Sequence, residues 1–159
     1  TSGIDSTYDS YVFKFYNIHP ASSNPHFQFQ GSTNSGSSYG VTATTTAFRA
    51  AHSEGDATAF GYLTGQDQAQ STDFIYLVNE VGNANDENCC GTLQIFNPSS
   101  SVFVKHFIAR TQSQFRTDGY SLDFYSAGYF NTTSAVDAVQ FKMSSGNIDS
   151  GVIKLYGVS

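Results

Sequence analysis

Four histidines and thirteen carboxylates are the residues of this chain that could hold a metal ion or move a proton. No two histidines stand at the helical i, i+4 spacing that places a pair on one zinc ion. The histidines are His19, His26, His52 and His106. We interpret them as ordinary exposed or hydrogen-bonded side chains, and we predict no metal site and no cofactor.

The carboxylates gather around residues 54–73 and 80–87. A glycosidase needs two carboxylates facing each other across a cleft, and nothing in the spacing pairs them in that way. No nucleophile constellation and no phosphate-binding loop stand out either. We therefore predict that the protein is not an enzyme.

Residues 82–88, GNANDEN, leave one alternative open, because they offer several oxygen ligands in seven residues, as a calcium loop does. The segment lacks the EF-hand pattern, and polar turns of this composition are common without calcium. Next in the chain stand the two cysteines, Cys89 and Cys90. Adjacent α-carbons lie closer than a disulfide normally spans, so we predict two reduced thiols at the start of a strand, one inward and one outward.

The composition points to the elements that must position these residues. Only 13% of the residues are charged, against about 25% in ordinary globular domains, while 15% are aromatic. Phe, Tyr and Thr favour sheets, and Gly, Asn and Ser favour turns. The net charge of −6 and the scattered basic residues argue against nucleic acid as a partner. No apolar run approaches the ~20 residues that span a membrane, so we predict no membrane association.

Apolar residues alternate with polar ones along nearly the whole chain, which is the period of a β-strand. We predict strands near residues 11–20, 26–30, 41–50, 74–81, 92–96, 102–109, 122–130, 136–143 and 152–156. Residues 52–72 lack a clean period and are predicted to form a long excursion with at most one short helical turn. The expected fold is one all-β domain over residues 1–159, a two-sheet sandwich of the jelly-roll kind.

Several tyrosines fall out of phase with the apolar rows or stand in loops. Tyrosine is enriched at subunit interfaces and adaptable binding surfaces, and few charges interrupt these faces. We therefore predict an interface rather than a catalytic centre, and we expect Tyr16 and Tyr156 to lie outside the core. The candidate interface residues are Tyr11, Tyr16, Tyr39, Tyr62 and Tyr156.

Several segments give the chain a recognisable character: YVFKFYNIHPA (11–21), TTTAFRAAH (44–52) and SSGNIDSGVIKLYG (144–157). With these segments the chain resembles a recurring β-rich domain of structural proteins from tailed phages, especially phages of marine bacteria. The resemblance implies a virion protein without catalytic residues, located on the particle surface. It also implies one further strand before Thr1, so that a short N-terminal segment would be missing here.

Two functions follow from the resemblance. The first is a capsid decoration or cement protein, a homo-oligomer and most simply a trimer, that contacts itself and other virion proteins such as the major capsid protein. The second is the receptor-binding head of a tail fibre, whose 31–40 and 52–72 loops would bind a host surface glycan. A carbohydrate-binding module of a secreted enzyme is a third, weaker alternative.

Overall fold

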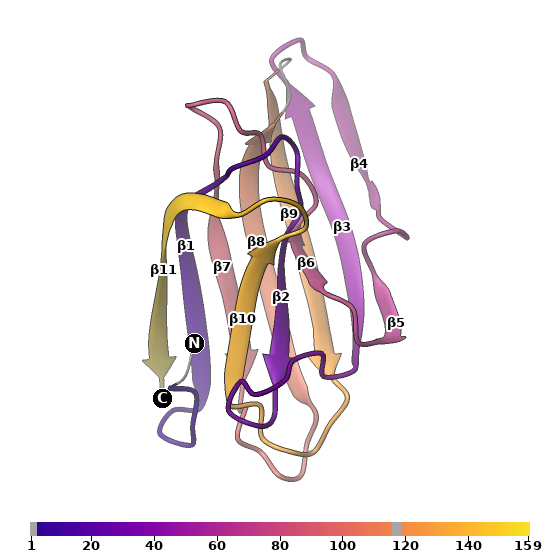
Figure 1. The fold of residues 1–159 in the computed structure, drawn as a ribbon. Coiled ribbons are helices and arrows are strands. Elements are labelled where there is room, and N and C mark those ends of the chain that lie inside the picture. The colour runs from indigo at the N-terminus through magenta and orange to yellow at the C-terminus, as the bar shows by residue number, and fades with distance from the viewer. Residues whose placement is uncertain (1–2, 116–118) are drawn as a thin grey trace.

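The computed structural model describes residues 3–115 and 119–159, which form eleven strands (Figure 1). Every regular element among these residues is a strand, as predicted. The strands are β1 (Ser10–Pro20), β2 (Phe27–Ser32), β3 (Ala43–Ser53), β4 (Thr58–Tyr62), β5 (Gln68–Ser71), β6 (Ile75–Val78), β7 (Cys89–Phe96), β8 (Lys105–Phe115), β9 (Tyr120–Phe130), β10 (Ala138–Met143) and β11 (Ile148–Val158).

The strands form two antiparallel sheets of unequal size. The larger sheet has eight strands in the order β11-β1-β7-β8-β9-β3-β4, with β5 also paired to β3, and the smaller has the order β10-β2-β6. Figure 1 shows the smaller sheet in front of the middle of the larger one. The two-sheet sandwich is therefore confirmed. The jelly-roll arrangement is not, because eight strands gather in one sheet and three in the other.

Phenylalanine rings from both sheets meet in the core. Phe13 and Phe15 point from β1 toward the small sheet because alternate residues of a strand share one face. Phe15 meets the ring of Phe27 edge-on at 5.1 Å, and Phe13 meets Phe141 at the same distance. Phe29 lies edge-on to Phe107 of β8 at 5.2 Å. Such edge-to-face pairs add to the burial of apolar area and hold the two sheets in one packing.

Hydroxyls on the inner face of β8 bond to backbone carbonyls of β6 and of the segment that follows it. Thr111 donates to the carbonyl of Leu77 in β6, and Ser113 Oγ donates to the carbonyl of Glu80 at 2.9 Å. At one end of the sandwich, the buried Lys105 donates from Nζ to the carbonyls of Phe103 and Thr132. Burial lowers the pKa of Lys105, and these carbonyls replace the water that its ammonium group has lost.

The prediction for residues 52–72 is wrong. The third strand continues to Ser53, and β4 and β5 both pair with it along its free side. Their sequences, TAFGY and QAQS, are short and polar at most positions. Phe60 and Tyr62 alternate in β4, but the strand is largely exposed and buries almost nothing. An edge strand needs only one hydrogen-bonded neighbour, so backbone pairing forms it where hydrophobic patterning gives no signal.

Candidate functional site: the outer face of the large sheet

The face of the large sheet that points away from the small sheet, here called the outer face, has no covering layer among the described residues. Cross-strand pairing arranges its side chains in rows. One row runs Lys154, Lys14, Thr92, Arg110, Tyr125, Phe48, Tyr62 across seven strands. The next runs Gln112, Asp123, Ala50, Phe60 across four. Large aromatic groups such as Phe60 and Tyr62 are exposed here beside charged side chains that lie in the same rows. Exposed apolar area of this kind is typical of contact surfaces.

Four rings on one half of this face form what we call the aromatic strip: Phe48, Phe60, Tyr62 and Tyr125. Phe48 and Tyr125 stack with centroids 4.6 Å apart and planes only 6° from parallel. Phe60 stands against Phe48 at 6.1 Å and is 79% exposed. Stacking fixes the inner rings, while Phe60 and Tyr62 keep open ring faces toward solvent.

A planar ion pair borders the aromatic strip. Arg110 on β8 donates to Asp123 on β9 through Nε at 3.0 Å and Nη2 at 2.6 Å, while its guanidinium lies 5.0 Å from the centre of the Tyr125 ring. The Tyr125 hydroxyl donates to Asp123 at 3.0 Å. Arg110 therefore holds the pKa of Asp123 below its ordinary value, with a further contribution from Tyr125. The group is rigid, and its two charges cancel.

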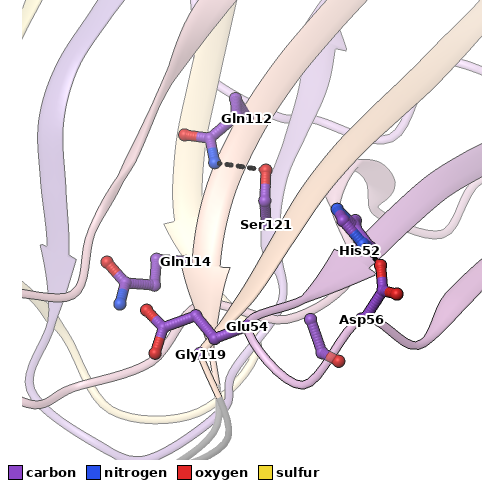
Figure 2. A pocket seen from close by; sticks show the side chains of 8 residues that line it. His52, Glu54, Asp56, Gln112, Gln114, Gly119 and Ser121 are labelled. Carbon is purple, nitrogen blue, oxygen red and sulfur yellow. Dashed lines mark hydrogen bonds and ion pairs between the residues drawn. The ribbon is translucent and has the colours of Figure 1, made fainter.

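Two shallow pockets continue from this ion pair along the sheet. Figure 2 shows the first, of about 430 Å³, with Gln112 bonded to Ser121 and His52 bonded to Asp56. The second has a similar volume, is lined by Arg110 and Asp123, and shares Gln112 and Ser121 with the first. The two pockets therefore form one track, which we call the polar groove: Arg110, Gln112, Ser121, Asp123 and His52.

The other half of the outer face, at the β1–β11 edge, combines tyrosines with lysines. Lys14 and Lys154 are direct cross-strand partners. Lys14 Nζ lies 5.3 Å from the ring centre of Tyr156, and Lys154 Nζ lies 5.4 Å from that of Tyr16. Like charges directly opposite each other are unfavourable, so the two rings partly offset a repulsion that a carboxylate from outside would relieve.

The five predicted interface tyrosines do not form one site. Tyr16 and Tyr156 lie on the outer face at 41% and 42% exposure, where strand alternation predicted them. Tyr62 lies at the opposite edge on β4, and the half-buried Tyr39 lies in the loop after β2. The prediction fails for Tyr11, which is 2% exposed and bonds Asp5 through its hydroxyl. Its place in the inward row with Phe13 already pointed to the core.

Sequence patterning missed the aromatic strip and the Arg110–Asp123 pair. The β8–β9 hairpin pairs Phe115 with Tyr120, and every later pair follows from that register, including Arg110 with Tyr125. The predicted strand over residues 102–109 ended too early, because the next residues of β8 are polar on both faces of the sheet. The dipeptide Asp118-Gly119, which as a sequence is typical of a hairpin turn, would have been the signal.

The remaining candidates take plain structural roles. Both thiols are free; Cys89 is buried at the start of β7 and Cys90 is partly exposed, as predicted. Burial raises the pKa of Cys89, and the neighbouring Cys90 raises it further. In the 82–88 loop the carboxylate of Glu87 accepts the backbone N–H of Ala84 at 2.8 Å, so it closes its own turn. Among residues 3–115 and 119–159 no group of three His, Cys, Asp or Glu side chains could share a metal ion.

Residues 36–40, GSSYG, spell the G-x-S-x-G pattern of a hydrolase nucleophile elbow, so the prediction that the sequence holds no such motif is wrong. That elbow needs a strand, a sharp turn and a helix, whereas this segment lies in the loop between β2 and β3. Ser38 bonds the side chain of Asn34, and the adjoining pocket of about 320 Å³ is lined by neither histidine nor carboxylate. The pattern here therefore lacks a general base.

Comparison with protein-family models, curated proteins and solved structures finds no match to this chain. Within the described part of the chain, no helix has the length and apolar character needed to cross a membrane.

Proposed function

We propose that this chain is a non-enzymatic structural protein of a bacteriophage particle, displayed on the particle surface as a capsid decoration protein. The observation that carries the proposal is the uncovered outer face of the large sheet, with its exposed aromatic rings. The sequence resemblance to phage structural domains is the reason for proposing a phage particle as the location. A protein whose work is to hold subunits together needs such a surface and needs no catalytic group.

The β1–β11 edge is the half of the outer face best suited to a protein contact. Tyr16, Val152 and Tyr156 expose apolar area there, and β11 has a hydrogen-bonded neighbour on one side only. The outer faces of β11, β1 and β7, with 11, 11 and 8 residues, present roughly 500 Å². A standard interface buries about 800 Å² on each partner, so this edge and its surroundings can form one stable contact.

Charge favours an acidic partner for this edge. Lys14 and Lys154 face each other, while the whole chain carries a net charge of −6. A second copy presents exposed carboxylates at its other edge, including Asp56 beside β4. Head-to-tail contact between opposite edges closes into a ring when the rotation fits, and three copies are the number that the resemblance suggests.

Copy number on the particle and the mass of the purified protein in solution test this proposal together. We expect hundreds of copies per particle, and a trimer by light scattering. Reversing the charge of both edge lysines (Lys14→Glu with Lys154→Glu) should abolish assembly. The matched control is Lys142→Glu, which changes a lysine that stacks on Phe74 beside the small sheet. Equal loss in the control, or a monomer that does not bind capsids, would contradict the proposal.

A receptor-binding head of a tail fibre is the second candidate function. One observation favours it: the aromatic strip and the polar groove lie together on the half of the outer face away from the β1–β11 edge. A few dozen copies or fewer per particle, confined to the tail, would establish this location instead.

A further inference from the structure

We infer that the aromatic strip and the polar groove beside it form a binding site for a neutral saccharide. The inference deepens the second candidate function by naming its ligand class. It does not depend on the location of the chain in a particle, because it concerns what the folded domain binds.

The site has a floor and walls of suitable size for a sugar ring. Ala50 stands between Asp123 and Phe60 in one cross-strand row, and Phe48 stands in the row alongside. Strands lie about 4.8 Å apart, so the small side chain of Ala50 leaves a dip about 10 Å wide between its two neighbours in the row. Phe60 and Phe48 lie beside that dip, and Asp123 bounds it on the side of β9.

The chemistry of the walls matches the two kinds of surface on a pyranose. The face of the sugar that carries axial C–H groups packs on aromatic rings, and its hydroxyls need donors and acceptors in the ring plane. Asp123 accepts, Arg110 donates, and Gln112, Ser121 and His52 do both along the groove. Only two of the three guanidinium nitrogens of Arg110 bond to Asp123.

Charge separates a saccharide from the other ligands that stack on aromatic rings. Single-stranded nucleic acid needs several cations along its backbone, and this half of the face offers Arg110, whose charge Asp123 already balances. An anionic sugar would meet the same neutral pair, the carboxylates of Glu54 and Asp56 that line the first pocket, and a chain of net charge −6. A neutral saccharide needs no cation and is not repelled by the negative charge of the chain. It can also use the preorganised hydrogen bonds of the Arg110–Asp123 pair.

The test is NMR titration of the isotope-labelled chain with defined neutral hexasaccharides: cellohexaose, laminarihexaose, maltohexaose and chitohexaose. Each is added to about 10 mM, enough to detect a millimolar dissociation constant. Hexagalacturonate serves as the acidic probe. We expect at least one neutral probe to shift signals of β3, β4 and β9 around the dip, and hexagalacturonate to bind more weakly than that probe.

Two variants and a matched control locate the binding. Phe60→Ala removes an exposed ring and should weaken binding about tenfold. Asp123→Asn removes the charge that orients Arg110 and should weaken it as well. Tyr16→Ala removes an equally accessible ring from the β1–β11 edge and should leave the affinity within about twofold.

Four results would overturn the inference: no shift with any neutral probe, binding of the acidic probe alone, equal losses in Phe60→Ala and Tyr16→Ala, or broadening of the strip signals with protein concentration before sugar is added. The last result would assign the aromatic strip to contact with a second copy. A monomer in solution that binds sugar would leave this inference standing while contradicting self-assembly, so the two failures are distinguishable.

Discussion

Removing one phenylalanine ring from the core and one from the outer face tests where the stability of this sandwich lies. Phe29 is fully buried and packs against Phe107 at 5.2 Å, with Phe130 and Phe141 near it. Phe60 loses the same atoms on mutation but is 79% exposed. The chemical change is identical, so any difference in unfolding free energy reports the environment of the ring.

The two substitutions should reduce the unfolding free energy by very different amounts. Truncating a buried phenylalanine to alanine costs about 3–5 kcal/mol through lost burial and the cavity left behind, and the whole domain has about 5–15 kcal/mol of unfolding free energy. With a urea slope of about 2 kcal/mol per molar, Phe29→Ala should lower the unfolding midpoint by roughly 1.5–2.5 M. Phe60→Ala should change stability by no more than about 0.5 kcal/mol.

Urea unfolding followed by circular dichroism and tyrosine fluorescence measures both midpoints. The reasoning fails if Phe60→Ala costs more than about 2 kcal/mol, because the aromatic strip would then belong to the stabilising core. It fails equally if Phe29→Ala costs less than about 1 kcal/mol, since the two sheets would not then share one packed interior.

Further predictions concern titration and thiol reactivity. Because Arg110 lowers the pKa of Asp123 in the folded state, the unfolded chain binds that proton more tightly. The carboxylate therefore stabilises the fold above about pH 4, and the contribution is lost as the pH falls through the lowered folded value. Asp123→Asn should flatten that part of the acid limb, as measured by urea midpoints from pH 6 to 3; an unchanged slope would contradict the assignment. A thiol reagent should modify Cys90 quickly in the native protein and Cys89 only after unfolding, because burial raises the pKa of Cys89 and blocks access. Equal native rates would contradict the placement.

Much of the fold could be predicted from the sequence because alternation is a local property. Phe13 and Phe15 had to face one way and Tyr16 the other once the strand was recognised. The division into eight and three strands could not be predicted, since β1 pairs with β11 from the far end of the chain. No local pattern records which distant strand becomes a neighbour.

The candidate site was harder to predict for the same reason. The contact between Phe48 and Tyr125 depends on the pairing of β3 with β9, and Phe60 joins them only through β4, a strand that the sequence pattern did not predict. Individual exposed tyrosines can be predicted from the alternation of side chains along a strand. A group of rings assembled from three strands requires the sheet order, which emerges only from the packing of the whole chain.

The pairing of the first and last strands also determines how the domain responds to mechanical load. Ser10 at the start of β1 lies opposite Val158 at the end of β11, so the chain enters and leaves these strands at the same end of the sheet. Tension applied between those two points opens the hydrogen bonds of β1 and β11 one after another, as a zipper, instead of shearing them all at once. The domain therefore yields at low force when pulled between Ser10 and Val158, whereas a load spread across the outer face is shared by all the strands of the large sheet.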